Sequence, residues 1–413
     1  MLKPPSDSDG VFLFNQKNIL KMKIKTNQIK ITPPKFGFNF CQFGELSQPV
    51  KEWCQHWNFK TEKAGPFTNI IIPEDINLFD CFELPEKYEL IDGFSPNLNK
   101  QLHVGHLSNL VLANAFQKLK IGKKSIAILG DTLKSGDTKK ETALELYKNW
   151  CKDFNYHLDD IYFASEMKLK DDILIDGEGS YQGTKVFDVG DEKVVGIKSN
   201  GSTSYFYQDV ALAQHLNKST LYLTGFEQDG HFKNLNKIFP HVSHLGLGLV
   251  MLDGKKMSSS EGNVIYLTKL VSDLEDKFNQ DIKLVYNILA GQILNSKPNQ
   301  IKSIDSSIID NPKLSLGLYL SYTMAHIKSC GVETKQITNY NSKKLQFAHI
   351  KSIENLNPSI LFKELVEHSK EINKHYEKMY IKDNPENIEF FSDLISDLEL
   401  GMLNLGMFSV EKV

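Results

Sequence analysis

The order strand, turn, helix, strand between residues 88 and 131 constrains the fold of this chain more than any other feature. The segment Y-E-L-I-D at 88–92 is typical of a buried strand, and a turn rich in glycine, serine, proline and asparagine follows it. Apolar residues then recur at helical spacing over 106–119, and 125–129 has the pattern of a second buried strand. This order predicts an α/β domain with a parallel sheet, whose ligands bind at the carboxyl ends of the strands.

The other patterns divide the chain into three predicted domains. Residues 1–62 are polar and mixed, and they predict a small, reduced N-terminal α+β domain with a helix at 48–57. Residues 63–266 form the α/β domain, which adds a strand at 68–73 and carries a polar, β-rich insertion near 132–204. Residues 267–413 predict an all-α domain, with helices at 270–278, 282–294, 316–329, 360–379 and 389–407.

Composition places the chain among cytoplasmic globular proteins. Apolar residues make up 41% and charged residues 24%, which is ordinary for that class. No apolar run is long enough to span a bilayer, and the N-terminus lacks the apolar stretch of a secretion signal. The five cysteines are scattered without a C-x-x-C pair, so we expect free thiols and no protein-bound structural metal.

Arginine is absent from all 413 residues, so each of the 48 basic residues is a lysine. Average usage would put roughly 25 arginines in a chain of this length. Chance and codon bias do not account for so complete a gap, which indicates exclusion by selection or by deliberate recoding. The net charge of −3 counts mildly against a nucleic-acid partner, whose surface would have to be a local face of lysines.

The first chemistry-bearing motif, S-P-N-L-N-K-Q-L-H-V-G-H, spans residues 95–106 where the strand runs into the helix. The imidazoles of His103 and His106 can donate hydrogen bonds to a triphosphate, and a helix N-terminus offers further N–H groups to anions. Gly105 lets a flat base lie against the backbone. Two such histidines are also common as ordinary surface or core residues, but their place between a strand and a helix favours a phosphate site.

The second motif, D-G-K-K-M-S-S-S-E-G-N, spans residues 253–263. Lys255 and Lys256 stand beside a serine run and a glycine, which suits a loop that grips a pyrophosphate leaving group. By itself such a string is most often a solvated loop. It is not a phosphate loop of the G-x-x-x-x-G-K-[ST] type.

Together and in this order, the two motifs resemble the H-I-G-H and K-M-S-K-S signatures of class I aminoacyl-tRNA synthetases. Residues 95–107 are similar to the S-P-N-x-x-K-x-x-H-V-G-H-L-R stretch of the arginyl-tRNA synthetases within that class. Further likenesses to that family lie at A-G-P-F-T-N-I (64–70), K-S-N-G (198–201), Y-F-Y-Q-D-V-A (205–211), F-E-Q-D-G-H (226–231), Y-L-S-Y-T-M-A-H (319–326) and F-G-E-L-S (43–47). Positions where the family commonly has arginine hold other residues here: Ser108, Gln208, Glu227, Ser260 and Lys328.

The resemblance implies a Rossmann-type catalytic domain, an all-α anticodon-binding-like domain and a set of site residues. The catalytic residues it implies are His103, His106, Lys256 and Lys100. The ATP-binding set comprises Gly105, His103, His106, Lys255, Lys256, Met257 and Ser258. The arginine-binding set comprises Asn97, Tyr205, Asp209 and Gln228, and the tRNA-binding set comprises Tyr319, Tyr322 and Lys328.

Elementary chemistry supports the arginine-binding set. A guanidinium is a planar fork of donors that needs acceptors in fixed places. Tyr205 and Asp209 are four residues apart at a predicted helix start, so they share one face, and Asp209 can take the guanidinium. The plainer alternative is that both residues only cap and pack the helix.

The implied partners are arginine, ATP with Mg²⁺, and tRNA(Arg), and we expect a monomer. The chain is shorter than typical members, and the family's G-D-W-G-x-Q-x-G survives only as Gly130-Asp131 followed by T-L-K-S-G. Two alternatives therefore stay open beside an arginine-tRNA ligase. One is a paralogue that activates arginine for a non-tRNA acceptor, and the other is a non-catalytic relative that senses arginine or tRNA.

Overall fold

The computed structural model describes residues 22–25, 40–73, 75–84, 88–131, 140–170, 173–256, 266–279, 281–305, 307–311, 314–379, 381 and 384–413. They belong to two compact units, Met1–Glu83 and Leu84–Val413. The first boundary therefore lies after Glu83, whereas the sequence pattern placed it after residue 62.

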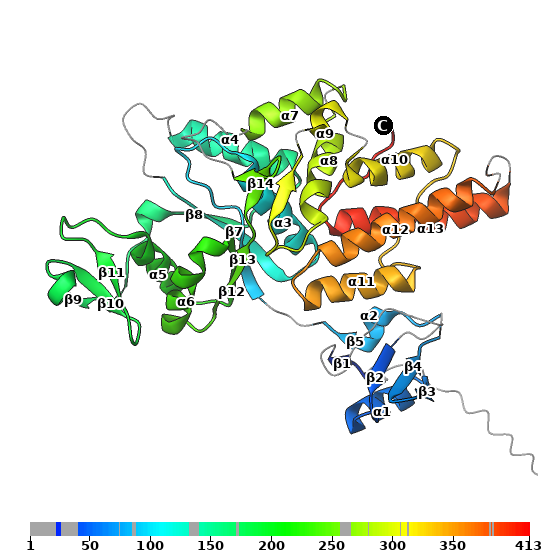
Figure 1. Cartoon of the computed structure of the whole chain (residues 1–413), viewed down its shortest axis with the longest axis horizontal. Coiled ribbons are helices and arrows are strands. Elements are labelled where there is room, and N and C mark those ends of the chain that lie inside the picture. Colours follow the sequence, from blue (N-terminus) through cyan, green and yellow to red (C-terminus); the bar gives the residue numbers. More distant parts are fainter. Residues whose placement is uncertain are drawn as a thin grey trace, which may run out of the picture. The chain divides into compact units, whose positions relative to one another are not determined.

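The N-terminal unit is a small α+β structure, as predicted (Figure 1). An antiparallel sheet has the order β2-β4-β3, and the short strands β1 and β5 pair in parallel. Within this unit Trp53 is fully buried, and its indole N–H donates to the carbonyl of Cys81 at 3.0 Å. The elements are β1 (Ile24–Lys25), β2 (Phe40–Phe43), α1 (Gln48–His56), β3 (Lys60–Ala64), β4 (Phe67–Ile71), α2 (Leu78–Cys81) and β5 (Phe82–Glu83).

Strand β4 explains the misplaced boundary. Its β-branched run predicted a strand correctly, but the sequence assigned that strand to the α/β domain. In the structure β4 pairs with β2 and β3 instead. A single strand pattern predicts burial and extension, whereas the choice of partner strand depends on tertiary contacts.

The second unit is built on a five-stranded parallel sheet with the order β13-β12-β6-β7-β8 (Figure 1). The chain starts in the middle at β6, moves outward through β7 and β8, and then crosses to β12 and β13 on the other side. The strand order thus reverses between β6 and β12, which is where open α/β sheets bind ligands. The strands are β6 (Tyr88–Asp92), β7 (Gly122–Leu129), β8 (Asp160–Phe163), β12 (Thr220–Gly225) and β13 (Val242–Leu247).

Helix α3 (Val104–Lys118) follows β6 and is buried along most of its length. Its middle packs so closely on the sheet that a Cβ on Gly93 would lie 2.6 Å from the Cβ of Ala113. Helices α5 (Tyr205–Leu216) and α6 (Asp229–Ile238) flank β12 in the chain. They share with Tyr222 an apolar cluster that includes Phe206 and Phe232.

The predicted β-rich insertion at 132–204 includes residues that belong to the parallel-sheet domain. Helix α4 (Lys140–Asp153) and strand β8 lie inside that range, and β8 is an edge strand of the parallel sheet. The β-rich part is a three-stranded antiparallel sheet of β9 (Ile175–Asp176), β10 (Lys185–Asp188) and β11 (Lys193–Ile197). Helix α4 was missed because only Ala143, Tyr147 and Cys151 on it are buried, which leaves a mostly polar sequence.

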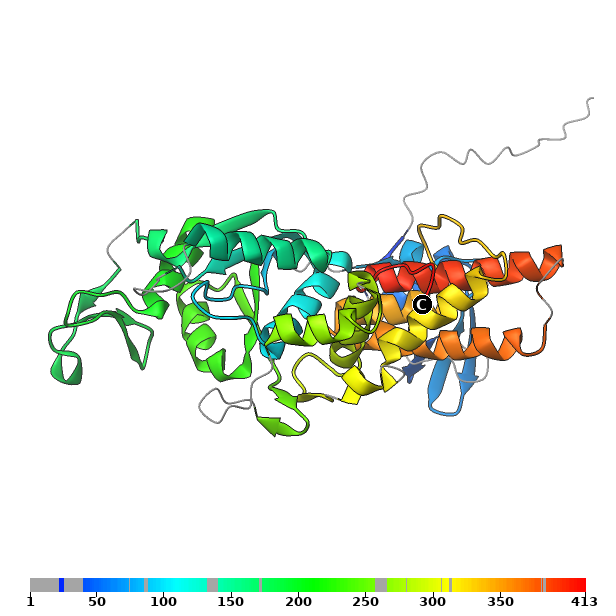
Figure 2. The same cartoon turned by 90° about the horizontal axis from the view of Figure 1, so that it is seen from above.

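The C-terminal region is mainly helical, as predicted (Figure 2). Helix α11 was not predicted, and β16 (Lys302–Ile304) pairs with β14 (Val250–Leu252), so the region is not purely helical. Helices α8 and α10 cross at glycines, since a Cβ on Gly317 would lie 1.8 Å from the carbonyl oxygen of Asn287. The helices are α7 (Leu267–Glu275), α8 (Ile282–Leu294), α9 (Ser307–Asp310), α10 (Leu316–Lys328), α11 (Lys343–Glu354), α12 (Ser359–Tyr376) and α13 (Pro385–Asn404).

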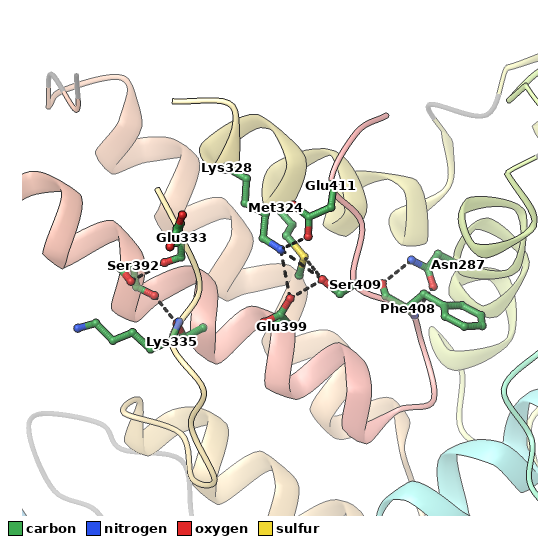
Figure 3. A network of polar contacts seen from close by, with 11 residues as sticks. Asn287, Met324, Lys328, Glu333, Lys335, Ser392, Glu399, Phe408, Ser409 and Glu411 are labelled. Atoms are coloured by element: carbon green, nitrogen blue, oxygen red, sulfur yellow. Dashed lines mark hydrogen bonds and ion pairs between the residues drawn. The ribbon is translucent and has the colours of Figure 1, made fainter. Parts of the chain in front are cut away.

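The tail after α13 holds these helices to the sheet domain (Figure 3). The backbone of Phe408 forms a reciprocal pair with the side chain of Asn287, with bonds of 2.8 and 2.9 Å. The carbonyl of Gly406 accepts from Asn114 of α3 at 3.3 Å, and Asn114 also donates to the Tyr286 hydroxyl at 3.0 Å. Across the described ranges, no helix combines the length and the apolar character needed to cross a membrane.

Candidate active site

A cavity of about 770 Å³ opens at the carboxyl ends of β6 and β12, where the strand order reverses. Its wall includes Asp92 from the end of β6, and Thr224 and Gly225 from the end of β12. The structure brings together in this wall six of the predicted site residues, Asn97, Lys100, His103, Gly105, His106 and Gln228.

The two histidines are fixed by the start of α3. His103 is the N-cap, and its Nδ1 accepts the backbone N–H of Gly105 at 3.1 Å. The Nδ1 of His106 accepts the backbone N–H of His103 at 3.1 Å, which completes a capping box. Because each Nδ1 is an acceptor, each neutral ring carries its proton on Nε2 and can donate it.

Both imidazoles are neutral at ordinary pH. Burial is the main cause of a lowered pKa for His103, and Lys100 adds to it. Burial, His103 and Lys100 together lower the pKa of His106 to about 3. The ring centroids lie 4.0 Å apart, so the pair forms one compact donor surface without a formal charge.

The lysine motif begins in a hairpin beside this cavity. Asp253 and Gly254 have φ of 48° and 75°, the left-handed values that a two-residue turn between β14 and β15 (Lys255–Lys256) requires. Of Lys256 the structure describes only the strand backbone, and Met257 and Ser258 lie outside the described residues.

The chain returns from this motif at Tyr266, next to the histidines. Tyr266 forms an antiparallel bridge with His103, and the N–H of Leu267 donates to the carbonyl of Leu102 at 2.9 Å. Tyr266 and Val250 also lie in the cavity wall. The ends of the lysine motif and the start of α3 are therefore neighbours, although about 150 residues separate them in the sequence.

Two carboxyls interact at this site, Asp92 in the cavity wall and Asp209 outside it. Asp92 is only 4% exposed and accepts a hydrogen bond from the hydroxyl of Ser95. Burial raises the pKa of Asp92 to about 7, and the negative charge of Asp209 raises it further against the opposing hydrogen bond from Ser95. Asp209 of α5 has its Oδ2 2.6 Å from Nε2 of His231. A buried carboxyl whose ionisation is opposed by a neighbouring carboxylate favours the approach of a cation.

Asp92 was missed by the sequence analysis. The signal was available, because an acidic residue that ends a buried strand just before a glycine-containing turn lies where such sheets bind ligands. Among the predicted residues, Asp209 lies outside the cavity wall but close enough to affect the ionisation of Asp92.

Asn97 is held in place by Gly130. The two residues form a parallel bridge, and the N–H of Leu98 donates to the carbonyl of Gly130 at 2.8 Å. A Cβ on Gly130 would lie 1.7 Å from Oδ1 of Asn97. The glycine that ends β7 is therefore required by the amide that lines the cavity. The residues that follow Asp131 in this stretch, 132–139, lie outside the described residues.

Known proteins similar to this chain indicate its relationship to a family. No family model matches the chain. The arginine-tRNA ligase of Borreliella afzelii is 24% identical over 539 residues, with 92% of this chain and 88% of that protein covered. That of Lactobacillus johnsonii is 24% identical over 321 residues, and the match spans 65% of this chain and 56% of that protein.

Solved structures agree on the fold. The arginyl-tRNA synthetase of Thermus thermophilus superposes with a TM-score of 0.63 at 15% identity, covering 93% of this chain and 96% of that one. The arginyl-tRNA synthetase of Plasmodium falciparum superposes with a TM-score of 0.58 at 18% identity, covering 86% of each chain. The chain is a homologue of the arginine-tRNA ligases. The predicted resemblance and the predicted fold class are thereby confirmed.

The remaining site residues that the resemblance to these ligases implied lie outside the cavity wall. Tyr205 is the first residue of α5, is 75% exposed and lies outside the cavity wall, one helical turn before Asp209. On α10, Tyr322 is 51% exposed and stacks on His326 with ring planes 8° apart. The hydroxyl of Tyr319 accepts from Asn373 at 2.9 Å.

Lys328, which the resemblance assigns to tRNA binding, is held by two carboxylates. Its side chain is only 10% exposed and forms ion pairs with Glu411 at 2.7 Å and Glu399 at 3.2 Å (Figure 3). The sequence could not show this, because both glutamates approach from distant parts of the chain. Within the described ranges, no group of three or more His, Cys, Asp or Glu side chains is arranged to hold a metal ion.

Proposed function

We propose that this chain is an arginine-tRNA ligase, which activates arginine with ATP and transfers it to the 3′ end of tRNA(Arg). The observation that carries the proposal is one cavity whose wall holds both a neutral histidine pair at a helix N-terminus and the buried carboxyl of Asp92, which lies within electrostatic reach of Asp209. The first group suits a nucleotide's phosphates, and the second suits a guanidinium.

The reaction has two balanced steps. A carboxylate oxygen of arginine attacks the α-phosphorus of ATP, an O–P bond forms, and pyrophosphate leaves with the electrons of the broken bond. A ribose hydroxyl of the terminal adenosine of tRNA then attacks the carbonyl carbon, AMP leaves, and the hydroxyl proton is lost. The attacking groups belong to the substrates, so the protein acts by positioning and electrostatic stabilisation.

The histidines stabilise the α-phosphate as negative charge grows on it. Nε2–H of His103 and of His106 can each donate to a non-bridging oxygen, and the capping bonds hold both rings in orientation. Because the rings are neutral, they add hydrogen bonds without holding pyrophosphate as tightly as a permanent cation would. Lys100 supplies positive charge at the cavity wall.

The carboxyl pair selects arginine. When a guanidinium enters, its positive charge favours the ionised form of Asp92, and its planar donors match the carboxylates of Asp92 and Asp209 better than an ammonium would. Gln228 in the wall offers a further amide oxygen, and Asn97 is placed to bind the substrate's α-amino or carboxylate end. Tyr205, one turn from Asp209, is proposed to cover the guanidinium from the solvent side.

ATP would bring its Mg²⁺ with the triphosphate, where the ion supplies charge neutralisation of the phosphate oxygens. Lys255, Lys256, Met257 and Ser258 are proposed to close on the β- and γ-phosphates from the hairpin beside Tyr266.

For the tRNA acceptor, the exposed ring of Tyr322 stacked on His326 offers a platform for an unpaired base, with Tyr319 beside it on α10.

The decisive experiment is aminoacylation of total bacterial tRNA with each radiolabelled amino acid in turn. We expect label to enter tRNA from arginine alone. ATP–pyrophosphate exchange measured with and without tRNA runs beside it. Exchange with arginine but no charging of any tRNA would favour the paralogue with a non-tRNA acceptor. Arginine binding with neither reaction would leave the non-catalytic alternative.

A further inference from the structure

Several positions that suit a guanidinium are filled by lysine in this fold. Lys335 bridges two carboxylates, Asp393 at 2.6 Å and Glu389. Lys328 likewise bridges Glu399 and Glu411 in a nearly buried position (Figure 3). The planar fork of arginine reaches two carboxylates at once, whereas an ammonium is a single point of charge, so arginine is the favoured residue at such sites.

Two further lysines lie where arginine would be ordinary. Lys302 is 1% exposed, and its Nζ donates to the carbonyls of Pro298 at 2.6 Å and Gln300 at 3.1 Å. Lys140 lies 3.7 Å above the ring of Phe163, a contact made more often by arginine. The fold therefore contains suitable places for arginine, and its absence from all 413 residues reflects exclusion of the residue itself.

We propose that this exclusion gives the chain a second function, that of a self-starting enzyme which restores arginine incorporation when no arginyl-tRNA is present. The proposal rests on the proposed arginine-tRNA ligase activity. A ligase that contains arginine needs its own product in order to be made, so its synthesis stops when the charged tRNA falls to zero. Translation of this chain meets no arginine codon, so the first molecules form without arginyl-tRNA and then generate it for all other proteins.

The structure supplies a matched control. The side chain of Lys335 is 38% exposed and faces two carboxylates, so Lys335→Arg keeps both charge and ion pairs while adding a single arginine codon. The variant should fold and charge tRNA like the parent chain. It differs only in requiring arginyl-tRNA for its own synthesis.

The test uses a translation system of purified components that lacks arginyl-tRNA synthetase and contains deacylated total bacterial tRNA. Messenger RNA for the chain is added with messenger RNA for a fluorescent reporter that contains arginine codons. We expect the parent message to yield reporter after a lag, and the Lys335→Arg message to yield at least tenfold less at the same time point. Purified protein of either form, added directly, should yield reporter at equal rates without the lag.

The outcomes separate the two proposals. If purified parent protein yields no reporter, the ligase activity itself is absent. If purified protein works but the parent message yields no reporter, the self-starting function is overturned. Equal reporter from the parent and Lys335→Arg messages would also overturn it, because one arginine codon would then be no obstacle.

Discussion

Replacement of His106 by alanine tests the proposed catalytic role of the histidine pair most directly. The substitution removes two interactions that can be measured separately. One is the Nε2–H donor at the cavity wall, and the other is the capping bond that Nδ1 accepts from the backbone of His103.

The two losses differ in size. A donor aimed at developing negative charge is worth on the order of 100- to 1,000-fold in kcat, or about 2.7–4 kcal/mol. Loss of one capping interaction lowers the free energy of unfolding by only about 0.5–2 kcal/mol. The variant should therefore remain folded, with a kcat for arginine-dependent ATP–pyrophosphate exchange lowered by at least roughly 100-fold.

The pKa of His106, lowered to about 3, adds a second criterion. The ring is neutral throughout the physiological range, so the ratio of parent to variant kcat should stay constant from pH 6 to pH 9. Steady-state exchange is measured over that range, and thermal unfolding of each protein is followed by circular dichroism. His157→Ala is the matched control, because that side chain is 74% exposed and should change neither quantity.

Two results would refute the reasoning. A His106→Ala protein within threefold of the parent kcat would show that the donor contributes nothing to the reaction. A ratio that changes steeply between pH 6 and pH 8 would show that an imidazolium acts instead of a neutral ring.

Three further changes test other parts of the site. A carboxyl whose pKa is higher in the folded protein than in the unfolded chain makes the folded protein less stable as pH rises from the lower pKa to the higher one. For Asp92 these two pKa values are 3.8 and about 7. Asp92→Asn should therefore stabilise the protein at pH 8 by up to a few kcal/mol in thermal unfolding, yet raise KM for arginine by roughly 10- to 150-fold. In the parent, the same pKa predicts that KM for arginine rises as pH falls below 7, by up to about tenfold per unit; a flat profile from pH 5.5 to 7.5 would remove Asp92 from the arginine site. Gly130→Ala should displace Asn97, whose Oδ1 would lie 1.7 Å from the new Cβ, and lower kcat/KM for arginine on the order of 100-fold in aminoacylation assays; unchanged kinetics would mean that Asn97 does not touch substrate. Tyr322→Ala should raise KM for tRNA, because binding loses the stacking of one base, which contributes about 1–3 kcal/mol, while KM for ATP stays constant. A change in both constants would instead indicate damage to the fold.

Local signals in the sequence were sufficient for much of the architecture. The alternation of buried strand and amphipathic helix around residues 88–131 predicted the parallel sheet, because hydrophobic periodicity depends on neighbours in the chain. The same holds for the start of α3, where His103 and His106 cap the helix from three residues apart. The histidine and lysine motifs, with the stretches around them, were enough to indicate the family.

Contacts between distant segments were not available from those signals. Strand β4 joined the N-terminal sheet instead of the parallel one, and the mostly polar helix α4 was hidden inside a supposed insertion. The resemblance assigned Lys328 to tRNA binding and could not show that the tail places Glu411 beside it. In each case the deciding partner lies far along the chain, and a periodic pattern carries no information about it.

The amino-acid order alone determined the class of fold, the histidine and lysine motifs and the complete exclusion of arginine, since each is local or compositional. Only the tertiary structure decided that Asp92 shares a cavity wall with the two histidines and lies within electrostatic reach of Asp209. Removal of the Asp92 carboxyl from water and the nearby negative charge of Asp209 raise the pKa of Asp92 to about 7, and both effects arise only when the sheet and α5 come together.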